Sequence, residues 1–180
     1  MKTGILSLLL ITFLSVGQAR GQQFAQPEKE HQWLKQFAGK WESTSEVMMG
    51  PDQPPMIVSG SMSARMLGEF WMIGELKAEM MGMEITAINT IGFDSKAKRF
   101  IGTWVDSSSD HVWHYKGSLD ASGKVLTLEA EGPNFADPEK TTLFRDIYEF
   151  KAADHLVLLS QMRDENGEWI QFAKGDLRRR

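Results

Sequence analysis

The segment GTWVDSSSDHVWHYKG, residues 102–117, decides the fold, because it consists of two alternating runs joined by a serine-rich turn. Side chains of a β-strand point alternately to opposite faces, so aromatic and polar residues at every second position indicate strands. When the turn is placed on the serines, Trp104 faces Trp113 and Gly102 faces Tyr115 across an antiparallel hairpin. An aromatic ring can then lie over a glycine, which predicts that this face of the hairpin points into a core.

The same alternation continues through most of the chain and predicts ten strands. The strands are expected at residues 41–48, 57–66, 70–80, 83–93, 99–105, 111–119, 125–131, 142–150, 156–162 and 169–177, separated by turns rich in Gly, Asp, Asn and Pro. Only one helix is indicated, which begins near Pro27 and ends at Gly39. An up-and-down meander of this length hides its two edge strands best by closing on itself. The predicted fold is therefore all-β, a single antiparallel up-and-down barrel of about ten strands with one short N-terminal helix.

The N-terminus has the pattern of a secretory signal peptide. Lys2 precedes an uncharged apolar run from Ile5 to Val16, and small residues follow at a cleavage site that we place after Ala19. We therefore expect a signal peptide at residues 1–19, an unstructured lead-in at 20–27 and a barrel domain at 28–180. The apolar run is too short to span a membrane, so we expect no membrane span after cleavage.

The composition restricts the compartment and the partners. The chain has no cysteine, which excludes a lipoprotein anchor, disulfides and thiolate metal sites. The prediction is an exported protein, periplasmic or extracellular. A formal net charge of −4 argues against nucleic-acid binding. The sequence leaves the oligomeric state open.

Two sets of motifs resemble known families. Gly39-Lys40-Trp41, preceded by a helix, resembles the Gly-x-Trp signature of the calycins, the lipocalin-like barrels. This resemblance implies that Trp41 closes one end of the barrel and that an arginine of the last strand, assigned here to Arg178, packs over it.

A second resemblance extends over residues 28–180. The motifs that carry it are HQWL (31–34), GKWE (39–42), RMLG (65–68) with Trp71, GFD (92–94), FIGTWVDS (100–107), HVW (111–113), GSLD (117–120), RD (145–146) and GEW (167–169). They resemble the bacterial "domain of unknown function 1579" (DUF1579) family. The resemblance implies a calycin-like barrel that is often exported and has no established activity.

The opening hairpin supplies most of the candidate site. We expect Trp104, Trp113 and Tyr115 to face inward, with Asp106 and His111 near one rim of the barrel. In one interpretation the aromatic rings fill the barrel and Asp106 orients His111 through a hydrogen bond. In the other, the rings line a pocket for a small, partly apolar ligand, because barrels of this size enclose room for one such molecule.

Two further side chains complete the candidate ligand-binding set. Tyr148 shares one face of the eighth predicted strand with Asp146 and with two phenylalanines. Arg65 alternates with methionines. If the methionine face points inward, Arg65 is solvated; if the arginine face does, Arg65 needs an acid such as Asp146 or Glu75, or binds a ligand carboxylate.

Metal and cofactor chemistry has few candidates, and we assign no cofactor, metal site or catalytic residue. Methionines at 80, 81 and 83 give copper(I) as one alternative, since thioethers are soft ligands, although methionines also fill cores. Haem ligated by His155 is another alternative. His111 and His114 are three residues apart in a strand, so they point to opposite faces and do not form a metal pair. Two other function classes stay open: a hydrolase or isomerase that uses Asp106 and His111 at the barrel mouth, and a structural or interaction module with a filled barrel.

Overall fold

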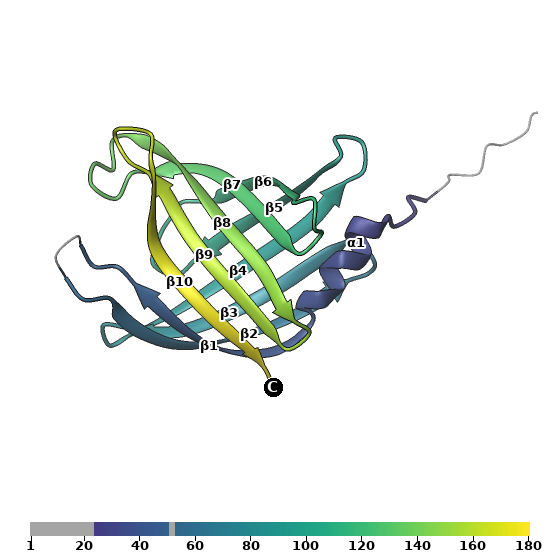
Figure 1. The fold of residues 1–180 in the computed structure, drawn as a ribbon, viewed down its shortest axis with the longest axis horizontal. Coiled ribbons are helices and arrows are strands. Elements are labelled where there is room, and N and C mark those ends of the chain that lie inside the picture. Colours follow the sequence, from purple (N-terminus) through teal and green to yellow (C-terminus); the bar gives the residue numbers. More distant parts are fainter. Residues whose placement is uncertain (1–23, 51–52) are drawn as a thin grey trace, which may run out of the picture.

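The computed structural model describes residues 24–50 and 53–180, and in this part of the chain it confirms the predicted all-β barrel (Figure 1). The ten strands are β1 (Gly39–Val47), β2 (Met56–Leu67), β3 (Trp71–Met80), β4 (Met83–Asp94), β5 (Arg99–Asp106), β6 (Trp113–Leu119), β7 (Val125–Pro133), β8 (Thr141–Ala152), β9 (His155–Arg163) and β10 (Trp169–Arg179). Each strand pairs antiparallel with its neighbours in sequence, and β1 also pairs with β10. The barrel is thereby closed, so it leaves no unpaired sheet edge.

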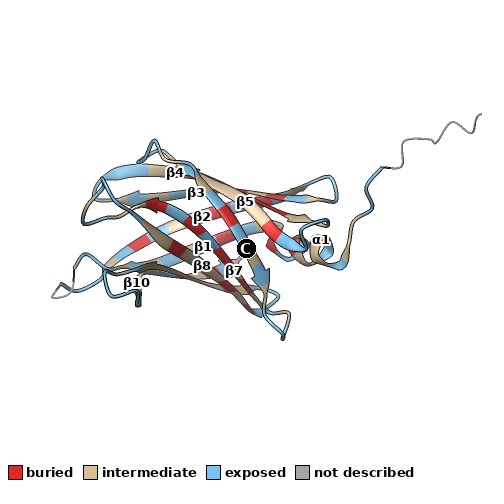
Figure 2. Cartoon of the chain, turned by 90° about the horizontal axis from the view of Figure 1, so that it is seen from above, coloured by how far each residue is buried: buried red, intermediate tan, exposed pale blue. Residues whose placement is uncertain are grey.

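Alternation along the strands separates the barrel interior from its surface. In β2, for example, Met62 and Ala64 are buried, whereas Ser61, Ser63 and Arg65 between them are exposed. Figure 2 shows the same alternation as buried and exposed bands along the strands. Because the side-chain period of a strand is two, the apolar pattern of the sequence fixes which face of each strand lies inside.

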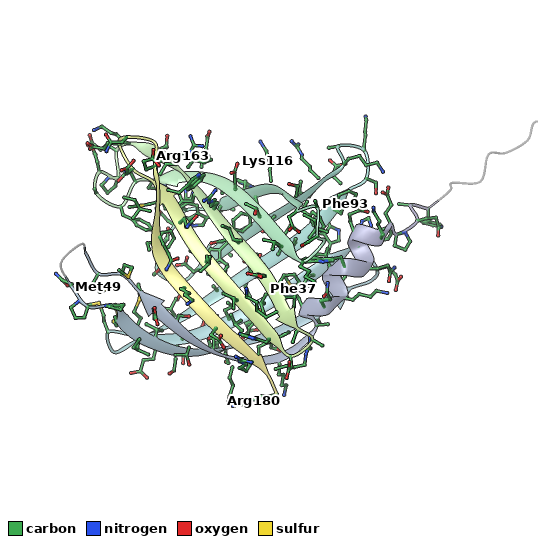
Figure 3. All side chains as sticks on the ribbon, in the orientation of Figure 1. Phe37, Met49, Phe93, Lys116, Arg163 and Arg180 are labelled. Carbon is green, nitrogen blue, oxygen red and sulfur yellow. The ribbon has the colours of Figure 1, made fainter. Side chains whose placement is uncertain are left out.

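A short helical segment covers one end of the barrel (Figure 1). It comprises the α-helix α1 (Lys29–Leu34) and a 3₁₀ turn, η1 (Lys35–Phe37). Leu34 and Phe37 of this segment are fully buried against the barrel. Removal of each side chain from water stabilises the fold by about 1.5–3 kcal/mol. Phe37 lies inside the helix end of the barrel in Figure 3.

Two hydrogen bonds attach α1 to the turns at this end. Trp33 Nε1 donates to the carbonyl of Gly123 at 2.7 Å, in the turn between β6 and β7. His31 Nδ1 accepts the backbone N–H of Glu28 at 2.9 Å, so its Nε2–H donates to the carbonyl of Phe93 at 3.1 Å. His31 is 2% exposed and both ring nitrogens are paired, so it has a structural role.

The predicted helix and strands are present with small shifts at their ends. The helix is shorter than predicted because its last turn tightens into a 3₁₀ turn before Ala38. In the described part of the chain, neither helical segment has the length and apolarity needed to cross a membrane. The predicted signal peptide, residues 1–19, lies outside the described residues.

Candidate functional site

A cavity of about 550 Å³ lies in the half of the barrel away from α1. Loops of the uncapped end contribute to its wall, namely Ser108 and Ser109 between β5 and β6, and Asn134, Phe135 and Pro138 between β7 and β8. The remaining lining residues come from the strands: Trp104, Asp106, Trp113, Tyr115, Pro133, Phe144, Arg145, Asp146, Leu158, Ser160 and Phe172. Six of the sixteen lining residues are aromatic, so most of the wall is apolar and rigid.

The β5–β6 hairpin brings the aromatic residues together in the predicted register. Trp104 pairs with Trp113 and Gly102 pairs with Tyr115. The Trp113 indole lies directly over Gly132 of β7, where a β-carbon would overlap the ring. Gly132 therefore makes room for this indole in the wall of the cavity.

A β-bulge in β10 adds Phe172 to the same wall. The pairing with β9 shifts between Gln171 and Ala173, so Phe172 is an extra residue without a partner. A bulge re-aims side chains and changes which residues face inward beyond it. The Phe172 ring here packs against Phe144, with centroids 6.0 Å apart, and against Phe135, with centroids 5.2 Å apart.

Asp146 of β8 places a half-buried carboxyl group in the cavity wall, close to side chains of β6 and β9. Asp146 Oδ2 accepts a hydrogen bond from the Tyr115 hydroxyl, and Oδ1 accepts one from the Ser160 hydroxyl at 2.5 Å. Burial raises the pKa of Asp146 above its ordinary value, although these two bonds oppose the shift. Burial also raises the pKa of Tyr115 well above 10, and the nearby Asp146 adds to this effect.

The second carboxyl group, Asp106, lies closer to the mouth. Its Oδ2 accepts the Trp104 indole N–H at 2.9 Å, and its Oδ1 accepts the backbone N–H of Ser108 at 2.9 Å and the Ser108 hydroxyl at 2.5 Å. Partial burial would raise the pKa of Asp106, but the bonds from Ser108 and Trp104 outweigh it and hold the pKa below the ordinary value. Asp106 is therefore an ionised carboxylate at neutral pH.

The predicted pair of Asp106 and His111 does not form, and this expectation was wrong. The carboxylate of Asp106 is used by Trp104 and Ser108, while His111 Nε2 lies 3.3 Å from the backbone carbonyl of Glu131. The imidazole packs edge-on against Trp113 and is not part of the cavity wall. The hairpin turn moves His111 off the strand, because β6 begins only at Trp113. The hydrolase or isomerase alternative required a hydrogen bond by which Asp106 orients His111 as a general base, and the described residues do not form it.

Arg65 and Tyr148 also lie outside the cavity wall. Arg65 is exposed on the outer face of β2, because the methionine face points inward, so the structure agrees with the solvated alternative for Arg65 and not with the inward one. Tyr148 points inward but lies deeper in the barrel, where its hydroxyl accepts the side-chain N–H of Asn89 at 3.0 Å. Asn89 Oδ1 has no hydrogen-bond partner among the described residues.

The arginine that packs over Trp41 is Arg179, not Arg178. The Arg179 guanidinium carbon lies 4.2 Å from the centroid of the Trp41 ring, whereas Arg178 is on the outer face and pairs with Asp176. The physical reason is the bulge at Phe172, which shifts the alternation of β10 by one residue. Gly39 fits its predicted structural role, because it has φ +135° and a β-carbon there would overlap the Arg179 guanidinium.

The predicted cofactor ligands do not meet at one place. His155 lies on the outer face, where Nε2 is 2.6 Å from Asp176 Oδ2, so it cannot ligate haem inside the barrel. The described residues contain no group of three or more His, Asp or Glu side chains suited to a metal ion. Met81 and Met83, of the copper(I) alternative, are exposed at the β3–β4 turn.

Sequence reasoning missed several residues of the wall. Asp146 and Ser160 were not assigned to a site, and Phe135, Phe144 and Phe172 were not recognised as lining residues. The inward alternation of Asp146 among aromatic residues was a usable signal, because an acid on a core face needs partners. Phe135 lies in a loop and Phe172 in a bulge, where alternation gives no information.

Comparison with known proteins now places the chain in a family. The family model described as "Protein of unknown function (DUF1579)" matches residues 26–179. The chain belongs to the DUF1579 family. This confirms the family expected from the sequence motifs.

Solved structures share the DUF1579 barrel at low sequence identity. The crystal structure of Rv2717c from M. tuberculosis is 14% identical, with a TM-score of 0.63, and the match covers 86% of this chain and 99% of that chain. The S-type phycobiliprotein lyase CPES from Guillardia theta is 11% identical, with a TM-score of 0.56 over 87% of this chain and 98% of that chain. Both likenesses show a shared fold. No curated protein matches this sequence.

Proposed function

We propose that this DUF1579 protein is an exported carrier that binds one small, partly apolar organic molecule in the cavity at the uncapped end of the barrel. The observation that carries the proposal is the cavity of about 550 Å³ with six aromatic residues in its wall. Ligand pockets generally enclose roughly 300–1,000 Å³ and combine apolar walls with a few placed polar groups.

The two ends of the barrel support a carrier rather than a filled module. Leu34 and Phe37 fill the end under α1 and leave no exposed surface of their own. At the other end Phe135 is 57% exposed beside the cavity. A barrel packed to the usual density of protein interiors has few voids larger than a water molecule. A void of about 550 Å³ at the uncapped end is large enough for a small ligand.

Rigid aromatic walls are also suited to a preformed site. Trp113 contacts Phe144 edge-on, with centroids 4.6 Å apart, and Phe144 contacts Phe135 at 5.2 Å. Side chains that are already ordered lose little conformational entropy when a ligand arrives. The shared fold with a phycobiliprotein lyase is compatible with such a pocket and adds no information on the ligand.

Filling the cavity tests the proposal. Leu158 lines the cavity and Leu159, the next residue of β9, points to the outer face, so Leu158→Trp and Leu159→Trp add the same indole on opposite sides of one strand. The mature protein is titrated with the neutral fluorophore N-phenyl-1-naphthylamine, and folding is checked by circular dichroism. We expect the wild type and Leu159→Trp to bind and Leu158→Trp to lose binding. Equal binding by all three proteins would refute a ligand site in the cavity.

Native mass spectrometry gives a second test without a chosen probe. The protein is purified from its own host and sprayed under native conditions, and the mass is compared with that of denatured protein. We expect an additional small-molecule mass on the wild type that Leu158→Trp lacks. The denatured mass also reports the N-terminus: export with cleavage after residue 19 predicts a chain that begins at Arg20, and an intact Met1 in the exported fraction would contradict it.

A further inference from the structure

We infer that the ligand is an organic cation, an amine or quaternary ammonium group on an apolar body. This inference rests on the proposed function and names the chemical class that the same cavity takes. It follows from three features of the wall: the sign of its charges, the direction of its hydrogen bonds and the faces of its aromatic rings.

The charged side chains that face the cavity are both acidic. The lining residues include three that carry charge, Asp106, Arg145 and Asp146. Arg145 lies between Phe144 and Asp146 in β8, which are both directed inward, so its own side chain points to the outer face. There its Nε donates to Gln161 Oε1 at 2.6 Å.

The Arg145 guanidinium is also held on that outer face by an aromatic ring. Its Cζ lies 4.0 Å from the centroid of the Trp169 ring, and Arg163 lies at 5.0 Å from the same ring. Arg145 is therefore not available to pair with Asp106 or Asp146. Among the described lining residues, no positively charged side chain points into the cavity to pair with either carboxyl group.

Four hydrogen-bond donors of the wall point at its two acids. The hydroxyls of Tyr115 and Ser160 donate to Asp146, and the indole of Trp104 and the hydroxyl of Ser108 donate to Asp106. A carboxylate oxygen accepts more than one hydrogen bond, so both acids keep free acceptor capacity. An anionic ligand would be repelled by the ionised Asp106, whereas an ammonium group is attracted to it and donates to the acceptor positions that the two acids keep free.

The aromatic rings favour the same ligand. Trp104 and Trp113 stand in register on adjacent strands, and Tyr115 and Phe144 lie beside them in the wall. The face of an aromatic ring attracts a cation, most strongly for tryptophan and most strongly when water is excluded. Aromatic faces together with carboxylates are the combination that recognises quaternary ammonium groups.

Cation binding is expected to be coupled to a proton of Asp146. Burial raises the pKa of Asp146, and a bound cation favours its ionised form, so cation binding strengthens as pH rises through that pKa. The groups that face Asp146 are Tyr115 on β6, Ser160 on β9, Tyr148 on its own strand and, near Tyr115, Asp106 on β5; its partner on β7 is the apolar Leu128. None of these supplies a competing positive charge.

Three probes of similar tail length test the inference. The mature wild-type protein is titrated with octyltrimethylammonium, n-octanol and octanoate, all below micelle formation, and binding is measured by calorimetry. We expect octyltrimethylammonium to bind tightest, by about tenfold or more over n-octanol, as one charge-assisted contact supplies. Octanoate is expected to bind weakest.

A pair of aspartate variants assigns the effect to the wall. Asp106→Asn is expected to weaken octyltrimethylammonium binding about tenfold and n-octanol binding by much less, because only the cation loses a charge-assisted contact. Asp110→Asn removes the same charge from an exposed position of the same loop that does not line the cavity, and it should change neither. Should Asp106→Asn fail to fold, the ranking of the three probes on the wild type decides by itself.

The outcomes separate this inference from the proposed function. Equal binding of the three probes, or tightest binding of octanoate, overturns the cation inference while the carrier function stands. If none of these probes and no neutral fluorophore binds, the carrier function fails and the cation inference fails with it. The inference would also be overturned if Asp106→Asn and Asp110→Asn weakened octyltrimethylammonium binding equally. The cation would then respond to the overall charge of the protein and not to a contact in the wall.

Discussion

Replacing Arg179 by alanine removes the side chain that ties the end of β10 to the helical cap and to Trp41. Its guanidinium lies over the Trp41 ring, and Nη2 donates to the carbonyl of Gln36 at 2.8 Å. Nη1 donates to the carbonyl of Ala38, and Nε donates to the carbonyl of Ala153 at 3.0 Å, in the turn between β8 and β9. One side chain thus joins three segments at the closed end of the barrel.

The expected loss of stability follows from these contacts. Each of the three hydrogen bonds is worth about 1 kcal/mol net, and less where water reaches the carbonyl. The cation–π contact adds about 0.5–2 kcal/mol, depending on how far water is excluded. Arg179→Ala should therefore lower the free energy of unfolding by about 2–4 kcal/mol. Arg178→Ala removes only an exposed ion pair with Asp176 and should cost about 0–1 kcal/mol.

Urea denaturation followed by tryptophan fluorescence measures both variants under identical conditions. The neighbouring arginines make a matched comparison, because the same chemical group is deleted one residue apart. A double-mutant cycle with Trp41→Phe isolates the stacking contribution, and we expect a coupling energy above about 0.5 kcal/mol with Arg179 and none with Arg178. If Arg178→Ala costs as much as Arg179→Ala, or couples to Trp41, the inward orientation derived from the bulge is refuted.

Three further perturbations test other parts of the structure. Burial raises the pKa of Asp146, so the native state binds more protons than the unfolded state and the free energy of unfolding falls as pH rises from about 4 through the raised value. The melting temperature of Asp146→Asn should therefore exceed that of the wild type by an amount that grows as pH rises through that range. A difference in melting temperature that does not depend on pH would contradict a raised pKa of Asp146. In Gly132→Ala the new β-carbon would lie 2.5 Å from Cη2 of Trp113, which should cost about 1–3 kcal/mol in urea denaturation and weaken the binding of the neutral fluorophore. Gly74→Ala is its control: it is also buried, but its nearest neighbour is 3.6 Å away, so stability should be unchanged or slightly higher. Trp33→Phe removes the indole bond to Gly123 and should cost about 1–3 kcal/mol in thermal unfolding without change in ligand binding, whereas a loss of binding would show that the two ends of the barrel are not independent.

The hairpin of residues 102–117 shows how far sequence reasoning reaches. Its register, with Trp104 opposite Trp113 and Gly102 opposite Tyr115, was predicted correctly because both strands are short, regular and joined by one turn. The position of His111 was predicted wrongly because this residue belongs to the turn. A turn has no fixed side-chain period, so its contacts depend on neighbouring strands such as β7, which supplies the carbonyl of Glu131.

The last strand shows a different limit. Alternation along β10 changes at Phe172, and nothing in the residues from Trp169 to Arg179 marks the extra residue. A bulge forms when pairing with a neighbouring strand leaves one residue over, so it depends on the length and twist of the closed sheet. One such residue decides both that Phe172 enters the cavity wall and that Arg179, rather than Arg178, lies over Trp41.

The sequence by itself determined the all-β class, the order of ten strands and the register of the hairpin at residues 102–117, because these follow from local alternation and turn chemistry. Only the tertiary structure decided that Asp146 meets Tyr115 and Ser160, which lie 31 and 14 residues away along the chain. Closure of the barrel also decided that one end is filled and the other is hollow. These features depend on the circumference of the closed sheet and on which side chains meet across it, and no local stretch of residues encodes either.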